Sequence, residues 1–150
     1  MLVLFPFEED YFRDRDISAT FVGHPVADEL PTGSKTEIRR RLALPQGIEL
    51  IALLPGSRNR EALNLGAHFL EAAVLLQEIR PGVEFVVPYV NDDIKKIFRD
   101  QLRRTASKIV LHEYCGRSRE VMAASTVVLA ASGTAALEAA ILQKPLIVAY

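Results

Sequence analysis

The chain has 150 residues, of which 49% are apolar and 25% charged, so it is long enough for one ordinary domain with a buried core. Its formal net charge of −1 gives no sign of a nucleic-acid partner. The single cysteine, Cys115, excludes an internal disulfide and a cysteine metal cluster, the three histidines are too dispersed for a metal site, and no apolar run is long enough to span a membrane.

The first part of the chain consists of short elements separated by proline and glycine. Its patterns predict strands at residues 2–5 and 19–22 and a helix at residues 6–13. Ser34 followed three residues later by Glu37 is a capping box, which predicts that another helix begins there. We expect residues 1–22 to be the tail of a preceding domain and residues 23–47 to be an interdomain connector and helix.

Residues 48–150 alternate regularly between short apolar runs and helical patterns. The apolar runs predict strands at residues 50–54, 83–87, 108–111, 126–130 and 145–149. The segments between them predict helices at residues 59–79, 92–104, 117–124 and 133–142. The longest helix has apolar residues on one face that we expect to be buried: Ala62, Leu65, Phe69, Ala72, Leu76 and Ile79. Such alternation predicts an α/β fold, a doubly wound parallel sheet covered by helices on both faces and truncated at its C-terminal end.

The segment at residues 127–138 has the pattern of an anion-binding turn. An apolar strand is followed by Ser132-Gly133-Thr134 and then by an alanine-rich run with strong helix propensity. A strand, a small-residue turn and a helix aim backbone N–H groups and the positive end of a helix dipole at an anion. Glu138 lies one helical turn beyond Thr134 and could accept hydrogen bonds from sugar hydroxyls. The pattern favours a ribose joined to a diphosphate, although an ordinary helix start with Glu138 placed for the dipole also fits.

A second small-residue turn, Gly56-Ser57-Arg58, follows the first strand of the predicted sheet. In a doubly wound sheet of order 3-2-1-4-5, the first and fourth strands are neighbours, and ligands bind beyond their carboxyl ends. The two turns therefore flank one predicted crevice, where Arg58 supplies a positive charge suited to phosphate. The G-x-G-x-x-G fingerprint is absent, which argues against a standard dinucleotide site. Further candidates for the rim of the crevice follow the second and third strands: Asn91, Tyr114 and Arg117.

Five blocks of the sequence resemble lipid-A-disaccharide synthase in their order and spacing, at residues 21–28, 53–58, 87–91, 118–122 and 131–138. The resemblance implies a GT-B glycosyltransferase with two Rossmann-like halves, of which the C-terminal half, here residues 48–150, binds the UDP-sugar. One departure is Thr126, which stands where the family has an aspartate. The residues that would face UDP are Ser57, Arg58, Ser132, Gly133 and Thr134 at the diphosphate and Glu138 at the ribose.

The resemblance also implies a reaction. The family transfers 2,3-diacylglucosamine from its UDP derivative to 2,3-diacylglucosamine 1-phosphate with inversion, forms a β-1,6 link and releases UDP, in lipid A biosynthesis. It needs no metal ion or cofactor, and it is peripheral on the cytoplasmic face of the bacterial inner membrane, whose surface is an implied partner. The general base and most of the acceptor site are expected in an N-terminal half that this chain lacks. The catalytic residues therefore stay unassigned, and we expect this chain alone to be inactive.

Two other functions fit parts of the same pattern. Another UDP-sugar enzyme of this architecture, such as a UDP-N-acetylglucosamine 2-epimerase, would share the block at residues 132–138. The block at residues 21–28 favours the synthase over the epimerase. A non-catalytic domain that binds a nucleotide is the alternative of a different class.

Overall fold

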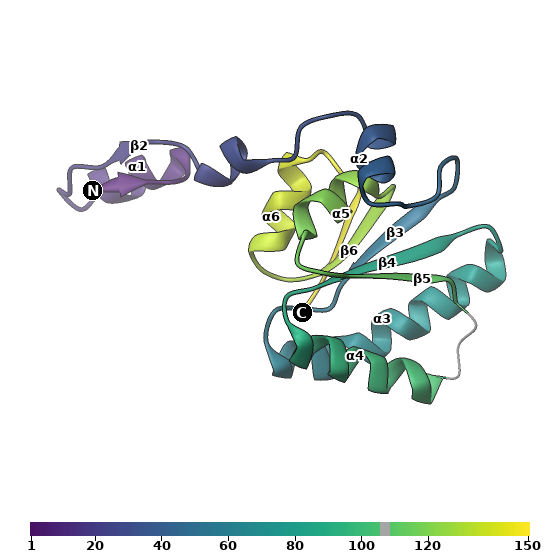
Figure 1. Cartoon of the computed structure of the whole chain (residues 1–150). Coiled ribbons are helices and arrows are strands. Elements are labelled where there is room, and N and C mark those ends of the chain that lie inside the picture. Colours follow the sequence, from purple (N-terminus) through teal and green to yellow (C-terminus); the bar gives the residue numbers. More distant parts are fainter. Residues whose placement is uncertain (106–108) are drawn as a thin grey trace. The chain divides into compact units, whose positions relative to one another are not determined.

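The computed structural model describes residues 1–105 and 109–150 (Figure 1), which form two compact units, Met1–Leu30 and Pro31–Tyr150. The expected division at residues 22 and 47 stays a prediction. Within the described residues, no helix is both long and apolar enough to cross a membrane.

The first unit is a pair of short parallel strands joined by a helix. Its elements are β1 (Leu2–Val3), α1 (Pro6–Arg13), β2 (Thr20–Phe21) and the 3₁₀ helix η1 (Pro25–Glu29). The Glu8 carboxylate accepts the Phe5 N–H at 2.8 Å, and His24 Nδ1 accepts the Val26 N–H at 3.2 Å. Both side chains satisfy N–H groups at helix starts, which have no partner within the helix. The predicted helix is confirmed, and the two predicted strands are present in shorter form.

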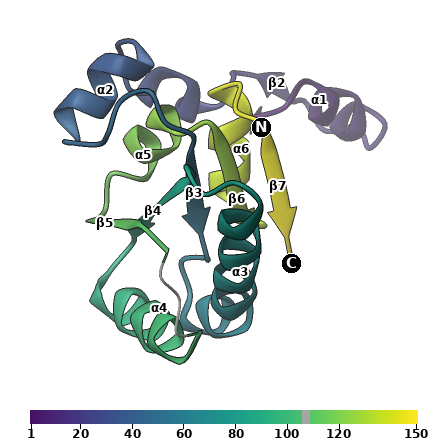
Figure 2. The same cartoon turned by 90° about the vertical axis from the view of Figure 1, so that its right-hand side faces the viewer.

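The second unit is a parallel sheet between two layers of helices (Figures 1 and 2). Among the described residues its strands are β3 (Leu50–Leu54), β4 (Glu84–Tyr89), β5 (Leu111–Cys115), β6 (Val127–Ala131) and β7 (Leu146–Ala149). The helices are α2 (Lys35–Arg41), α3 (Asn59–Ile79), α4 (Asp92–Thr105), α5 (Ser118–Ala124) and α6 (Thr134–Ile141). The strand order is β5-β4-β3-β6-β7, which is 3-2-1-4-5 in chain order, so the predicted doubly wound sheet is confirmed.

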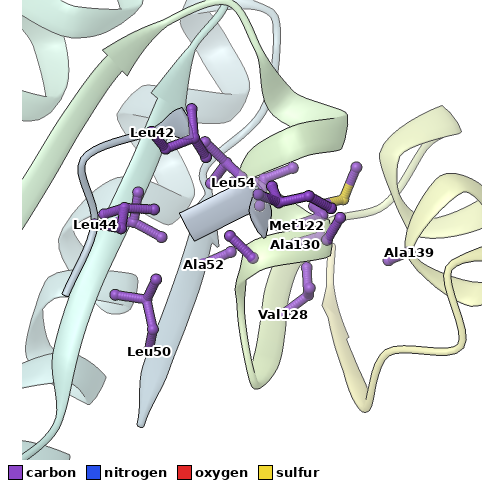
Figure 3. Close-up of a cluster of buried hydrophobic side chains, with 14 residues drawn as sticks. Leu42, Leu44, Leu50, Ala52, Leu54, Met122, Val128, Ala130 and Ala139 are labelled. Atoms are coloured by element: carbon purple, nitrogen blue, oxygen red, sulfur yellow. The ribbon is translucent and has the colours of Figure 1, made fainter. Parts of the chain in front are cut away.

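Apolar cores lie on both faces of the sheet, because successive strand residues point to opposite faces. On β3, the side chains of Leu50, Ala52 and Leu54 point toward α2, α5 and α6. They pack there with Met122 of α5 (Figure 3). Leu53 points to the other face and packs with the buried residues of α3 and α4. This continuous burial of β3 is typical of a central parallel strand.

Three cations gather at the C-terminal end of α5. Arg39 of α2 is buried, with 3% of its surface exposed, and donates to the Ala124 carbonyl at 2.8 Å. Lys35 donates from Nζ to the Thr126 hydroxyl at 3.0 Å. Lys144 donates to two further carbonyls at the same end, those of Ala123 and Ser125. Cations suit the negative end of a helix dipole and its unpaired carbonyls, so these contacts hold α2 against the sheet.

The buried face of α3 agrees with the predicted one in part. Ala62 and Phe69 are buried as expected, and Leu65 and Leu76 are part-buried against the same core. Ala72 is exposed, and Ile79 is 76% exposed. The buried Gly66, which the apolar pattern did not include, faces α4 so closely that an added Cβ would lie 2.1 Å from Gln101 Oε1 and 3.2 Å from Phe98. Small residues allow two helices to approach each other closely. The spacing of apolar residues in the sequence does not indicate where such a close approach occurs.

The third strand of the sheet begins later than predicted. We expected residues 108–111, of which 108 lies outside the described residues, and the structure has β5 at Leu111–Cys115. β5 is an edge strand with only part-buried side chains, so its residues need not be apolar. Among them, Glu113 accepts hydrogen bonds from the Tyr89 hydroxyl at 2.7 Å and from Arg99 at 2.8 Å.

This carboxylate generates a pH prediction. The Arg99 guanidinium holds the pKa of Glu113 below its ordinary value, although partial burial opposes the effect. A carboxyl group with a lowered folded-state pKa contributes stability above its unfolded pKa and loses it as pH falls through the folded value. We expect Glu113→Gln to lower the free energy of unfolding by about 1–3 kcal/mol at pH 7. The difference should be smaller in urea titrations at pH 3 than at pH 7, because pH 3 lies closer to the lowered folded-state pKa of Glu113.

The matched control is Glu49→Gln. Glu49 also pairs with an arginine, Arg80, at 2.9 Å, but both side chains are half exposed or more. Exposed pairs contribute about 0–1 kcal/mol, so this change should have little effect at either pH. An equal loss from Glu113→Gln at pH 7 and pH 3 would mean that shape, not charge, is what Glu113 contributes.

Candidate functional site

The two small-residue turns lie beside each other because β3 and β6 are parallel neighbours. Their register pairs Ile51 with Val127 and continues to Leu54 with Ala130. Each strand therefore delivers its turn to the same edge of the sheet, Gly56-Ser57-Arg58 after β3 and Ser132-Gly133-Thr134 after β6. Both turns line one cavity of about 280 Å³. The predicted crevice between the first and fourth strands of the sheet is confirmed.

The turn after β6 presents an open helix N-terminus to the cavity. Gly133 is the N-cap of α6 and has φ 148° and ψ −161°, a conformation that is nearly restricted to glycine. An added Cβ would meet nothing within 4 Å, so the backbone conformation, not crowding, requires glycine. Ser132, Gly133 and Thr134 are exposed, and Gly133 has no side chain that could cap the helix. The N–H groups at the start of α6 thus suit an anion.

The turn after β3 is arranged differently, because a carboxylate lies in it. Glu61 Oε2 accepts the N–H groups of Ser57 at 3.0 Å and Arg58 at 3.3 Å, and Glu61 Oε1 accepts Arg58 NH1 at 2.8 Å. The Arg58 guanidinium first, then these N–H groups, hold the pKa of Glu61 below its ordinary value. Gly56, at φ 113°, lies under Glu61, and an added Cβ would be 2.6 Å from Glu61 Cβ.

Glu61 is a residue of the site that the sequence reading did not select. It lies three residues after Arg58, the N-cap of α3, and a glutamate at that spacing is a recognised partner of the N-cap N–H. This spacing is visible in the sequence and could have identified Glu61. Six further cavity residues were also not selected: Leu54, Pro88, Val90, Ser118, Ala131 and Ala135.

The three rim candidates do not line the cavity and have partners within the chain. Asn91 Oδ1 accepts the Ile94 N–H at 2.9 Å and so caps α4. The Tyr114 hydroxyl donates to the Leu42 carbonyl, beneath α2. Arg117 forms a two-pronged ion pair with a glutamate one helical turn away, Glu120, at 2.6 and 3.0 Å. Contacts of these three residues with a ligand stay predictions.

Glu138 also lies outside the lining of the cavity. It is 7% exposed, and its Oε1 accepts Arg119 Nε of α5 at 2.9 Å. It is not in the first turn of α6, so service to the helix dipole does not explain it. Ser118, the sequence neighbour of Arg119, does line the cavity. Its contact with a ribose stays a prediction.

The lining defines what the cavity can do chemically. Among the described residues that line it, Arg58 and Glu61 are the ionisable ones, and four hydroxyls accompany them, those of Ser57, Ser118, Ser132 and Thr134. A helix N-terminus, a guanidinium and hydroxyl donors suit the binding of an anionic group such as a diphosphate. The described residues contain no cluster of three or more His, Cys, Asp or Glu placed to hold a metal ion.

Comparison with solved structures defines the class of fold. WaaG, a glycosyltransferase involved in lipopolysaccharide biosynthesis, is 17% identical and superimposes with a TM-score of 0.52 over 98% of this chain and 43% of that chain. UDP-GlcNAc 2-epimerase from Neisseria meningitidis, solved with UDP-GlcNAc, is 22% identical with a TM-score of 0.54, over 76% of this chain and 30% of that one. The fold is that of a Rossmann-like half of a GT-B glycosyltransferase.

Within this class, the chain belongs to the lipid-A-disaccharide synthetase family, whose model matches residues 1–150. The lipid-A-disaccharide synthase of Xylella fastidiosa is 43% identical over the whole chain. This chain spans 40% of the length of that relative. The resemblance noted in the sequence is confirmed.

The turn glycines give a stability prediction. We expect Gly56→Ala to lower the free energy of unfolding by at least about 2 kcal/mol, because it combines a left-handed φ with a clash against Glu61 Cβ. Gly133→Ala should cost less, about 1–3 kcal/mol, from conformation alone. Gly82→Ala is the control, since its Cβ meets nothing and its φ is not in the left-handed region. Urea unfolding that gave all three variants the same stability would contradict this account.

Proposed function

We propose that the chain is the donor-nucleotide part of a lipid-A-disaccharide synthase, and that the cavity beside β3 and β6 binds the diphosphate of UDP-2,3-diacylglucosamine. One observation carries the proposal: the two small-residue turns and Arg58 line a single cavity at the carboxyl edge of the sheet. Family membership over the whole chain supports the same assignment. The similarity to the 2-epimerase, at 22% identity, concerns fold alone and does not favour that activity.

In this proposal the site stabilises the leaving group. Negative charge grows on the UDP diphosphate as the bond to the sugar breaks. The N–H groups at the start of α6 and the Arg58 side chain belong to the lining of the cavity, so once the diphosphate is bound little reorganisation is needed during the reaction. The acceptor, 2,3-diacylglucosamine 1-phosphate, and the general base belong to the rest of the intact enzyme. That enzyme would act as a peripheral protein on the cytoplasmic face of the inner membrane.

The test has two parts. Calorimetric titration of the chain should give tighter binding of UDP than of UMP, since the second phosphate adds contacts to α6 and Arg58. The product of the full-length gene should form the disaccharide from the two lipid substrates and release UDP. A full-length product that binds UDP but makes no disaccharide would leave a nucleotide-binding domain and refute the synthase.

The ribose contact of Glu138 is tested by a cycle of two proteins and two nucleotides. If Glu138 accepts the ribose hydroxyls, Glu138→Gln should weaken UDP binding about ten- to a hundredfold, since charge-assisted hydrogen bonds contribute about 1.5–3 kcal/mol. The loss should be much smaller for 2′,3′-dideoxy-UDP, which lacks those hydroxyls. The comparison is needed because the same change also removes the negative charge that Glu138 places beside Arg119. Equal losses for both nucleotides would leave Glu138 as a structural partner of Arg119 only.

A further inference from the structure

The N-termini of α3 and α6 at the cavity differ in whether an anion of the chain already occupies them. The start of α6 carries exposed residues and a glycine N-cap. The start of α3 is already occupied by an anion that the chain itself supplies, the Glu61 carboxylate. Both termini belong to the cavity that we assign to the diphosphate.

Glu61 makes the contacts that a phosphate would make. Its carboxylate oxygens accept two backbone N–H groups, of Ser57 and Arg58, and one guanidinium N–H. The guanidinium is one of the donors that the proposed function directs at the diphosphate, and the two N–H groups belong to a turn that lines the same cavity. The Glu61 side chain is 28% exposed, so solvent and solutes reach it. A bound diphosphate and the Glu61 carboxylate therefore compete for the same donors, and their like charges repel each other.

The ion pair between Arg58 and Glu61 can easily be replaced by a pair between Arg58 and a phosphate. The Arg58 side chain is 81% exposed, and exposed ion pairs contribute little to stability. Arginine binds phosphate through two parallel hydrogen bonds, which are stronger than a single contact with one carboxylate oxygen. A diphosphate that enters the cavity can therefore take the guanidinium from Glu61.

We propose that Glu61 is an internal competitor of the diphosphate: it occupies the N–H groups of Ser57 and Arg58 and the Arg58 guanidinium in the free protein, and a nucleoside diphosphate displaces it. This inference rests on the proposed function of the cavity. The consequence is that Glu61 limits the affinity for nucleoside diphosphates and favours their release. For an enzyme that must release UDP after each transfer, such an exchange shortens the time that product remains bound.

Glu61→Gln separates competition from capping. A glutamine oxygen can still accept the Ser57 and Arg58 N–H groups, and glutamine serves at this position of a capping box. The variant removes the negative charge and frees Arg58, while the turn keeps its cap. Glu71→Gln is the matched control, because Glu71 is also on α3 and pairs with His68 at 3.2 Å, outside the lining of the cavity.

The experiment is calorimetric titration of the 150-residue chain and both variants with UDP, UMP, uridine and inorganic pyrophosphate at one salt concentration. We expect Glu61→Gln to bind UDP and pyrophosphate about three- to tenfold tighter than the wild type. The ligand then no longer has to break the exposed ion pair between Arg58 and Glu61 before it binds. The gain should be smaller for UMP and absent for uridine. Glu71→Gln should match the wild type with all four ligands. Adding Arg58→Gln should reduce the gain from Glu61→Gln, since the guanidinium is the shared donor.

The outcomes separate the inference from the proposed function. Wild-type chain that binds UDP, with a Glu61→Gln variant that binds it equally or more weakly, overturns the competition and leaves the nucleotide site standing. Wild-type chain that binds neither UDP nor pyrophosphate overturns the proposed site and the inference with it. If Glu61→Gln does not fold, the wild type itself provides the test by NMR. The Glu61 carboxyl carbon and the Ser57 and Arg58 N–H signals should shift together as pyrophosphate is added, and an unchanged Glu61 carbon would refute displacement.

Discussion

The site depends on one pairing, the parallel ladder between β3 and β6. Neither small-residue turn makes a binding site alone, and the ladder from Ile51–Val127 to Leu54–Ala130 brings both to one cavity. The ladder is fixed by burial on both faces, with Ala52 and Val128 in one core and Leu53 in the other. A slip of one residue would turn every side chain of a strand to the opposite face. Packing in the core therefore sets the distance between the turns, and the core reaches the cavity itself at Leu54 and Ala131.

Much of the fold could be predicted because it follows from local chemistry and a general rule of topology. Ser34 and Glu37 form the expected capping box, with the Glu37 N–H to Ser34 Oγ at 3.3 Å. Strand–helix alternation indicated a doubly wound sheet, and the observed strand order is one of the common orders of such sheets. The errors occurred where tertiary contacts outweigh periodicity. The buried face of α3 is set by the close approach of α4 at Gly66, and β5 contains polar residues because it is an edge strand whose Glu113 has partners on other elements.

The candidate site, like the fold, could be predicted where it follows from local sequence and from the topology of the sheet. Residues of the two turns follow from strand ends and small side chains, and the cavity contains all six of them. Side chains that depend on distant partners could not be placed. Arg119 and Glu138 lie on different helices, and no pattern in the sequence indicates that they pair at 2.9 Å. Thr126 is a similar case: its hydroxyl accepts from Lys35, a contact that only the packing of α2 creates.

The arrangement at Ser57 reflects a general conflict in anion sites. Several N–H groups and a guanidinium that converge on a cavity repel one another and lack partners when no ligand is bound. A carboxylate inside the turn resolves this, because an acidic side chain at a helix N-terminus contributes about 0.3–1 kcal/mol to stability. The same carboxylate weakens the attraction of the turn for phosphate. Gly56 is part of this compromise, since only a residue without Cβ leaves room for Glu61 to fold back over the turn. In the free protein, Gly56 therefore provides space for an internal anion.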